Sequence, residues 1–167
     1  MADLLRRLRQ SSRVMSSGLA LGLLVGIPHA TAAQGPGTEN GTWSFLGGDA
    51  WHTRYTPATE ITPSNFEDLE VVWEWDAGSF GPSTPRATPS YVDGKLITVT
   101  GERRHVVALD AGTGELIWSY TEPRTWRHDY SMRAGYGKGV TIGEVDGRKV
   151  VYISSPAFFL HALDAKT

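Results

Sequence analysis

Residues 123–139 hold the side chains with the clearest chemical potential in this chain. The segment contains Arg124, Trp126, Arg127, His128, Asp129, Tyr130, Arg133, Tyr136 and Lys138. Guanidinium and ammonium groups hold carboxylates through charge-assisted hydrogen bonds, so these cations suit an anionic ligand. The alternative is that they are solvated or pair with Asp129. We take the segment as the best candidate for function.

Other site chemistries receive little support. His52, His105, His128 and His161 are not at metal-ligand spacing. The glycine-dense run at residues 135–139 lacks the spacing of phosphate-binding loops, which also require a helix, and is interpreted as a connecting loop. The net charge is −2 and basic residues cluster only within the first 13 positions, which argues against a nucleic-acid partner.

The elements that would position the segment are visible as a repeat. Residues 108–118, Ala-Leu-Asp-Ala-Gly-Thr-Gly-Glu-Leu-Ile-Trp, begin again at Ala162 as Ala-Leu-Asp-Ala-Lys-Thr. The two starting alanines are 54 positions apart, a period typical of stacked β-units or propeller blades. The apolar run 105–109, the Asp/Gly/Thr turn and the run 115–120 predict a hairpin, with Trp118 lying across the small Ala108.

Two Asp-Gly pairs mark further hairpins. Asp93-Gly94 separates residues 87–92 from 95–100, and Asp146-Gly147 separates 139–144 from 148–154. With residues 158–163 the second group has three strands. Residues 69–75 read as an earlier strand that completes the last unit of a closed ring.

The pattern A-x-D-x-x-T-G-x-x-x-W resembles the tryptophan docking motif of quinoprotein dehydrogenases. The stretch upstream resembles the entry segment of the same family. Its matching residues are Trp43, Gly47, Gly48, Asp49, Arg54, Tyr55, Ile61, Asn65, Leu69 and Trp73. The resemblance implies an all-β fold, part of an eight-bladed β-propeller of four-stranded antiparallel blades. Residues 43–167 would be its N-terminal part, truncated in the second blade.

The resemblance also implies a function. Such enzymes hold pyrroloquinoline quinone (PQQ) on the propeller axis beside a calcium or lanthanide ion and oxidise an alcohol or sugar by hydride transfer. The electron acceptor would be a cytochrome or a quinone. The catalytic aspartate and the metal ligands come from later blades, beyond Thr167. The alternative is a non-catalytic propeller of the same repeats that serves as a protein-binding scaffold.

Three residues are candidates for cofactor binding on this resemblance. Lys138-Gly139-Val140 is similar to the family's Arg-Gly-Val segment, whose cation faces a cofactor carboxylate, and Arg133-Ala134-Gly135 is the second alignment. Arg86 stands where quinoproteins often have a glutamate beside the cofactor. A cation there either contacts an anionic group or means that the quinone site is lost.

The chain has no cysteine, so no disulfide supports the fold. This separates it from quinoproteins in which adjacent cysteines form a disulfide ring over the cofactor. The sequence is therefore closer to the glucose-dehydrogenase type.

The N-terminus reads as an export signal. Arg6, Arg7, Arg9 and Arg13 precede an apolar core at residues 18–27 and small residues at 30–33. The core is too short for a stable membrane span, which needs about 20 residues; an uncleaved anchor is the alternative. Residues 1–33 are thus a predicted signal peptide and 34–42 a flexible leader. The mature protein is expected to be periplasmic or secreted.

Overall fold

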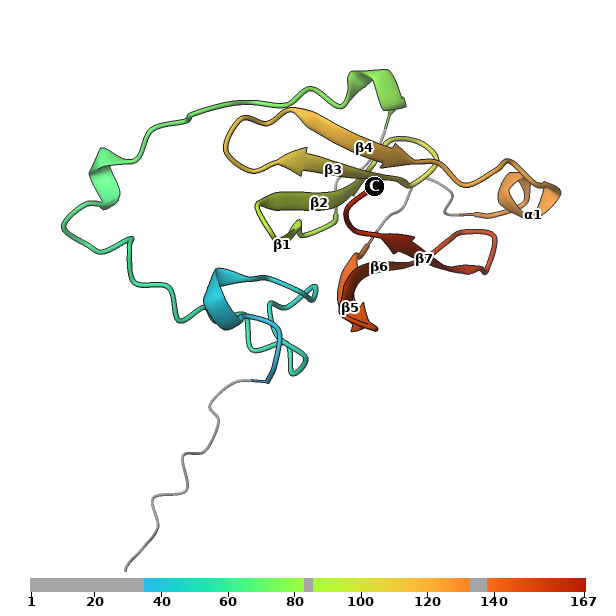
Figure 1. Cartoon of the computed structure of the whole chain (residues 1–167). Coiled ribbons are helices and arrows are strands. Elements are labelled where there is room, and N and C mark those ends of the chain that lie inside the picture. Colours follow the sequence, from blue (N-terminus) through green and yellow to red (C-terminus); the bar gives the residue numbers. More distant parts are fainter. Residues whose placement is uncertain (1–34, 83–85, 133–137) are drawn as a thin grey trace, which may run out of the picture. The chain divides into compact units, whose positions relative to one another are not determined.

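The computed structural model describes residues 35–82, 86–132 and 138–167. Its regular structure is almost entirely β (Figure 1). One antiparallel sheet contains β1 (Ser90–Val92), β2 (Lys95–Thr100), β3 (His105–Asp110) and β4 (Leu116–Tyr120), in that order. A second contains β5 (Thr141–Val145), β6 (Arg148–Ser154) and β7 (Leu160–Asp164). All the predicted hairpins are confirmed. The predicted signal peptide lies outside the described residues.

The Asp-Gly pairs close the first hairpin of each sheet. Asp93 and Gly94 have φ of 47° and 73°, and Asp146 and Gly147 have φ of 50° and 74°. Positive φ at both central residues matches the twist of the flanking strands, and Asp and Gly tolerate it. Val92 therefore pairs with Lys95, and Val145 with Arg148, directly across the turn.

The core lies between the two sheets. Val106 and Ala108 of the first sheet, Val151 of the second sheet and Val140 just before β5 have no solvent exposure and belong to one hydrophobic cluster. A strand that is covered on both faces needs apolar residues throughout, which explains the continuous run in β3. Each sheet thus buries a face against its neighbour in sequence.

Two tryptophans make the same contact in successive positions of the repeat. Trp73 Nε1 donates to the carbonyl oxygen of Ala111 at 3.1 Å, and Trp118 Nε1 donates to that of Ala165 at 3.2 Å. Trp118 pairs with Ala108 across the hairpin, as predicted, and its indole reaches the second unit at Ala165, as the resemblance to a docking motif implies. A Cβ on Gly114 would lie 2.7 Å from the Trp73 ring, so the glycine of the turn admits the indole.

Residues 69–75 differ from the prediction. Within the described residues they pair with no strand, and Val71 and Val72 are 79% and 82% exposed. Trp73, Trp75 and Ala77 are nevertheless half-buried while the residues between them are exposed. The segment therefore has the alternating burial of a strand but forms no strand pairing within the described residues.

The segment before β1 is irregular, and its part at residues 43–44 contacts both sheets. It includes the 3₁₀ turns η1 (Glu39–Gly41), η2 (Phe66–Asp68) and η3 (Gly78–Phe80). Trp43 exchanges two backbone hydrogen bonds with Tyr91 of β1, at 2.9 and 3.0 Å. The amide of Ile142 in β5 donates to Ser44 at 2.7 Å.

Gly35, within the predicted flexible leader, is hydrogen bonded to this segment through Asp49. The fully buried Asp49 carboxylate accepts hydrogen bonds from the amides of Gly35 (2.7 Å) and Thr53 (2.8 Å) and from the Thr53 hydroxyl (2.9 Å). Burial by itself would raise the pKa of Asp49, but these donors outweigh it and hold the pKa below its ordinary value of 3.8. The carboxylate therefore links the leader to the fold.

Replacing Asp49 with Asn should lower the melting temperature at pH 7 by on the order of 5 °C, since the amide group loses acceptor capacity. Because the folded pKa lies below the unfolded one, the stability from Asp49 is present above about pH 4 and is lost as the pH falls further. Thermal melts of wild type and Asp49→Asn from pH 7 to 3 should therefore converge. Equal melting temperatures at pH 7 would contradict this role.

The segment after β4 contains one element that the sequence does not predict. It is the single helical turn α1 (Trp126–Asp129). Among the described residues no helix has the length and apolar character needed to cross a membrane.

Candidate cofactor site

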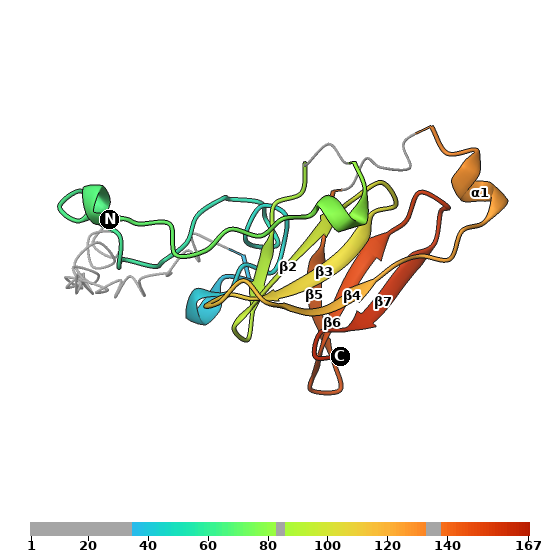
Figure 2. The ribbon, with the colours of Figure 1, turned by 90° about the horizontal axis from the view of Figure 1, so that it is seen from above.

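The candidate cations flank the beginnings of β1 and β5, which lie next to each other. The Ser90 hydroxyl donates to the Val140 carbonyl oxygen at 3.2 Å, and both residues are fully buried. Because the strands are antiparallel, this end of the sheets also carries the turn at residues 101–104 and the end of β4. We call it the entry edge; Figure 2 shows η3 and α1 at this end of the strands.

Two of the three predicted site residues can be placed there. Arg86 lies four residues before Ser90 and Lys138 two residues before Val140, and both side chains are exposed. Arg133 lies outside the described residues. The backbone thus brings Arg86 and Lys138 to the same edge of neighbouring sheets. Two cations so placed could hold carboxylates of one ligand.

Other cations of the segment contact groups of the chain itself. Arg124 Nε lies 2.6 Å from Asp129 Oδ1, and this hydrogen bond lowers the pKa of Asp129. The Arg127 guanidinium lies 5.5 Å from the ring centroids of both Trp126 and Phe159, within cation–π range. The alternative of pairing with Asp129 is therefore correct for Arg124. Lys138 is a stronger candidate than Arg124 or Arg127 for binding an anionic ligand.

An apolar groove of about 870 Å³ lies beside α1. Its aromatic and aliphatic walls come from α1, the residues after it and the turn before β7. Exposed members are Trp126, Tyr130, Met132, Phe158 and Leu160.

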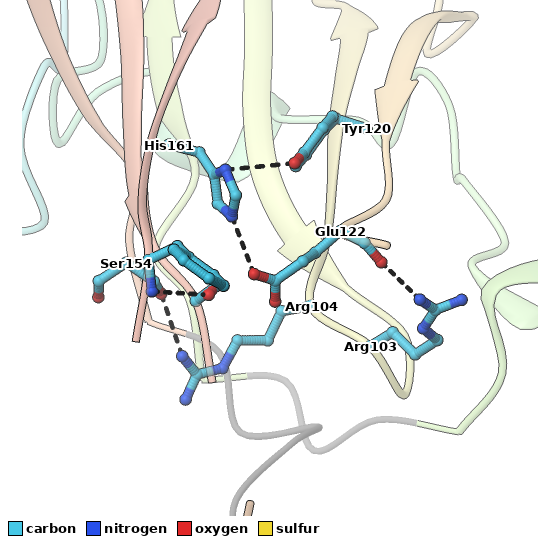
Figure 3. A network of polar contacts seen from close by, with 8 residues as sticks. Arg103, Arg104, Tyr120, Glu122, Ser154 and His161 are labelled. Atoms are coloured by element: carbon cyan, nitrogen blue, oxygen red, sulfur yellow. Dashed lines mark hydrogen bonds and ion pairs between the residues drawn. The ribbon is translucent and has the colours of Figure 1, made fainter. Parts of the chain in front are cut away.

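A polar network at the entry edge escaped the sequence analysis. His161 of β7 lies between Tyr120 of β4 and Glu122 (Figure 3). Its Nδ1 is 3.2 Å from the Tyr120 hydroxyl, and its Nε2 is 3.0 Å from Glu122 Oε1. Glu122 is only 5% exposed. Burial, followed by the charge of Glu122, raises the pKa of Tyr120.

Two arginines extend this network. Arg103 donates to the Glu122 carbonyl oxygen, and Arg104 donates to that of Ser154 at 3.1 Å. A cavity of about 10 Å³ lies among these side chains. The network joins the two sheets through residues 39 to 41 positions apart, so no local motif reveals it.

The described residues bring no three His, Asp or Glu side chains together in a cluster that could hold a metal ion.

A family model described as the PQQ glucose/ethanol/alcohol dehydrogenase β-propeller domain matches residues 43–167. The match covers most of the chain, and the chain belongs to this family of PQQ-type β-propeller dehydrogenases. Its first sheet is a propeller blade of four strands, and its second sheet contains three strands of the next blade.

Similar proteins include alcohol and glycerol dehydrogenases. The 1-butanol dehydrogenase (cytochrome c) of Thauera butanivorans is 31% identical over 171 residues, which cover 96% of this chain and 22% of that protein. The solved quinohemoprotein alcohol dehydrogenase ADH-IIG of Pseudomonas putida is 33% identical, with a TM-score of 0.62 over 76% of this chain and 18% of its own. The quinohemoprotein alcohol dehydrogenase of Comamonas testosteroni has a TM-score of 0.59 and 28% identity over 75% of this chain and 18% of its own.

The chain spans about a fifth of the length of the relatives that it matches.

Proposed function

We propose that this chain is the N-terminal part of a PQQ-dependent dehydrogenase that oxidises an alcohol by hydride transfer to the quinone. The observation that carries the proposal is the repeated indole-to-carbonyl contact of Trp73 and Trp118, within a sequence that matches the family model over residues 43–167. The names of the relatives favour an alcohol over a sugar. The 167 residues contain no cysteine, so this part of the protein supplies no adjacent-cysteine ring.

The positive charge of the entry edge is complementary to the negative charge of the cofactor. The quinone carries three carboxylates. Arg86 and Lys138 are exposed cations that precede the adjacent strands β1 and β5. We assign them, with Arg133, to binding and orienting those carboxylates. When bound, the quinone would supply the hydride acceptor and a calcium or lanthanide ion would supply the Lewis acid. The ligands of that ion would come from later blades.

We expect the electron acceptor to be a cytochrome or a quinone, because one relative is named for cytochrome c and another for a quinone. The test is cofactor-dependent turnover. Full-length apo protein should oxidise 1-butanol with an artificial electron acceptor only after PQQ and calcium or a lanthanide are added. Turnover that does not depend on PQQ would refute the proposal.

The alternative, a non-catalytic propeller that serves as a protein-binding scaffold, makes a different prediction. It predicts a stable propeller that binds no quinone under any metal condition. Replacement of the family's glutamate by Arg86 is the residue-level feature that favours it.

We expect the mature protein to begin at Ala33 or Gln34, because Ala30 and Ala32 have the spacing of small residues before a cleavage site. N-terminal sequencing of exported protein checks the position. An intact Met1 on membrane-embedded protein would instead show an uncleaved anchor.

A further inference from the structure

Asn40 and Gly41 form the exposed tip of the turn η1, within the predicted leader (the blue turn in Figure 1). Asn40 lies in the left-handed region, with φ of 53° and ψ of 33°, and Gly41 follows with φ of 79°. A Cβ on Gly41 would have no atom within 4 Å. The chain therefore has open space around the peptide group that joins the two residues.

The two asparagines of the 167 residues, Asn40 and Asn65, differ in how their side chains are held. Within the described residues the side-chain amide of Asn40 makes no hydrogen bond. Asn65 Oδ1 accepts from the Thr62 amide at 2.7 Å and from the Thr62 hydroxyl at 3.1 Å, and its Nδ2 donates to the Glu60 carbonyl oxygen at 2.8 Å. Only the side chain of Asn40 is free to react with its own backbone.

An asparagine that precedes glycine can lose its amide group to the next residue. The backbone nitrogen of Gly41 would attack Cγ of Asn40, ammonia would leave, and a five-membered succinimide would form. Water then opens the ring at one of its two carbonyl carbons, which gives aspartate or isoaspartate. Glycine favours the attack because it has no Cβ beside the nitrogen. In isoaspartate the chain runs through the former side chain and is longer by one methylene group.

The structure shows what ring closure has to overcome. At ψ of 33° the Gly41 nitrogen points away from the Asn40 side chain, so the Cα–C bond of Asn40 must rotate. The turn is closed by Thr42, whose amide and hydroxyl donate to the Glu39 carbonyl oxygen at 3.0 and 2.8 Å. Leaving the left-handed region is not opposed by local sterics, since a residue with a Cβ prefers other conformations. An exposed turn held by so few bonds opens readily.

We propose that Asn40 is a site of spontaneous deamidation and that its isoaspartyl product loosens the attachment of the leader. Gly37 donates to Glu39 Oε2 at 2.8 Å and accepts from the Ser44 amide at 2.9 Å, so the two ends of the turn are bonded to each other. An added methylene group between them changes their spacing. The new carboxylate also lies next to Glu39 in sequence, and like charges repel. This proposal does not depend on the proposed function.

The test is ageing of the full-length protein at mildly alkaline pH, followed by mass analysis of its tryptic peptides. Trypsin cleaves after Arg54 and Arg86, so the peptide that ends at Arg54 contains Asn40 and peptide 55–86 contains Asn65. Deamidation replaces an amide NH2 with a hydroxyl and raises the peptide mass, and chromatography separates the two products. Asn40→Gln is the matched control, because glutamine would have to close a larger ring.

We expect Asn40 to deamidate at least about tenfold faster than Asn65, whose hydrogen bonds must break first, with isoaspartate among the products. Hydrogen exchange at the amides of Gly37 and Ser44 should become faster in aged wild type and stay unchanged in aged Asn40→Gln.

Equal rates at Asn40 and Asn65 would overturn the proposal. An Asn40 that reacts in urea-unfolded protein but not in the folded protein would also overturn it, because the turn would then protect the residue. Unchanged exchange at Gly37 and Ser44 after full conversion to isoaspartate would overturn the effect on the leader.

Discussion

Truncation of Trp118 to alanine is expected to produce the largest loss of stability in the chain. The indole packs against the hydrophobic cluster and donates to the Ala165 carbonyl oxygen at 3.2 Å, so it joins the outer strand of one blade to the next. Removing a buried tryptophan costs about 3 to 5 kcal/mol, and because Trp118 is half-buried we expect about 3. The full-length variant should melt several degrees earlier.

Trp126→Ala is the matched control. The substitution is the same, but Trp126 lies on α1 with 69% of its surface exposed. It should change the free energy of unfolding by less than about 1 kcal/mol. If Trp118→Ala melted at the wild-type temperature, or no earlier than Trp126→Ala, the docking role would be wrong.

Replacement of Lys138 by alanine should have the largest effect on cofactor binding. A charge-assisted hydrogen bond in a partly desolvated site contributes roughly 1.5 to 3 kcal/mol, which corresponds to about tenfold to a hundredfold weaker quinone binding. The melting temperature of the apo protein should stay nearly unchanged, because the side chain is exposed. Titration of apo protein with the quinone measures the change.

Lys138→Arg should keep most of the affinity, since arginine retains the charge and its guanidinium can donate two parallel hydrogen bonds to one carboxylate. Lys166→Ala, also an exposed lysine but at the opposite end of the strands, is the matched control and should bind normally. If Arg133→Ala weakened binding and Lys138→Ala did not, the alignment of the Arg-Gly-Val segment would shift to Arg133.

The strands could be predicted because their signals are local. Asp93-Gly94 and Asp146-Gly147 determine hairpins by turn chemistry, and the spacing of Ala108 and Ala162 predicts stacked units. Residues 69–75 have the right alternation, yet a strand also needs an edge to pair with, which no local pattern supplies.

The site was less accessible to sequence reasoning. The repeat places Arg86 and Lys138 before the first strand of each unit. The structure accordingly has both residues at the entry edge. The pairing of Glu122 with His161 could not be read from local spacing, because docking of two blades brings them together. The available signal was a comparison of repeats, in which an acid and a histidine occupy positions that are apolar one interface earlier.

The central claim is that these blades belong to a propeller that binds PQQ. Its most direct test is the titration of full-length wild-type apo protein with the quinone, in the presence of calcium or a lanthanide, with tryptophan fluorescence as the signal. We expect the quinone to quench the fluorescence in a saturable way, with a weaker affinity in Lys138→Ala. No quenching with either metal would contradict it and would favour a propeller that acts as a protein-binding scaffold.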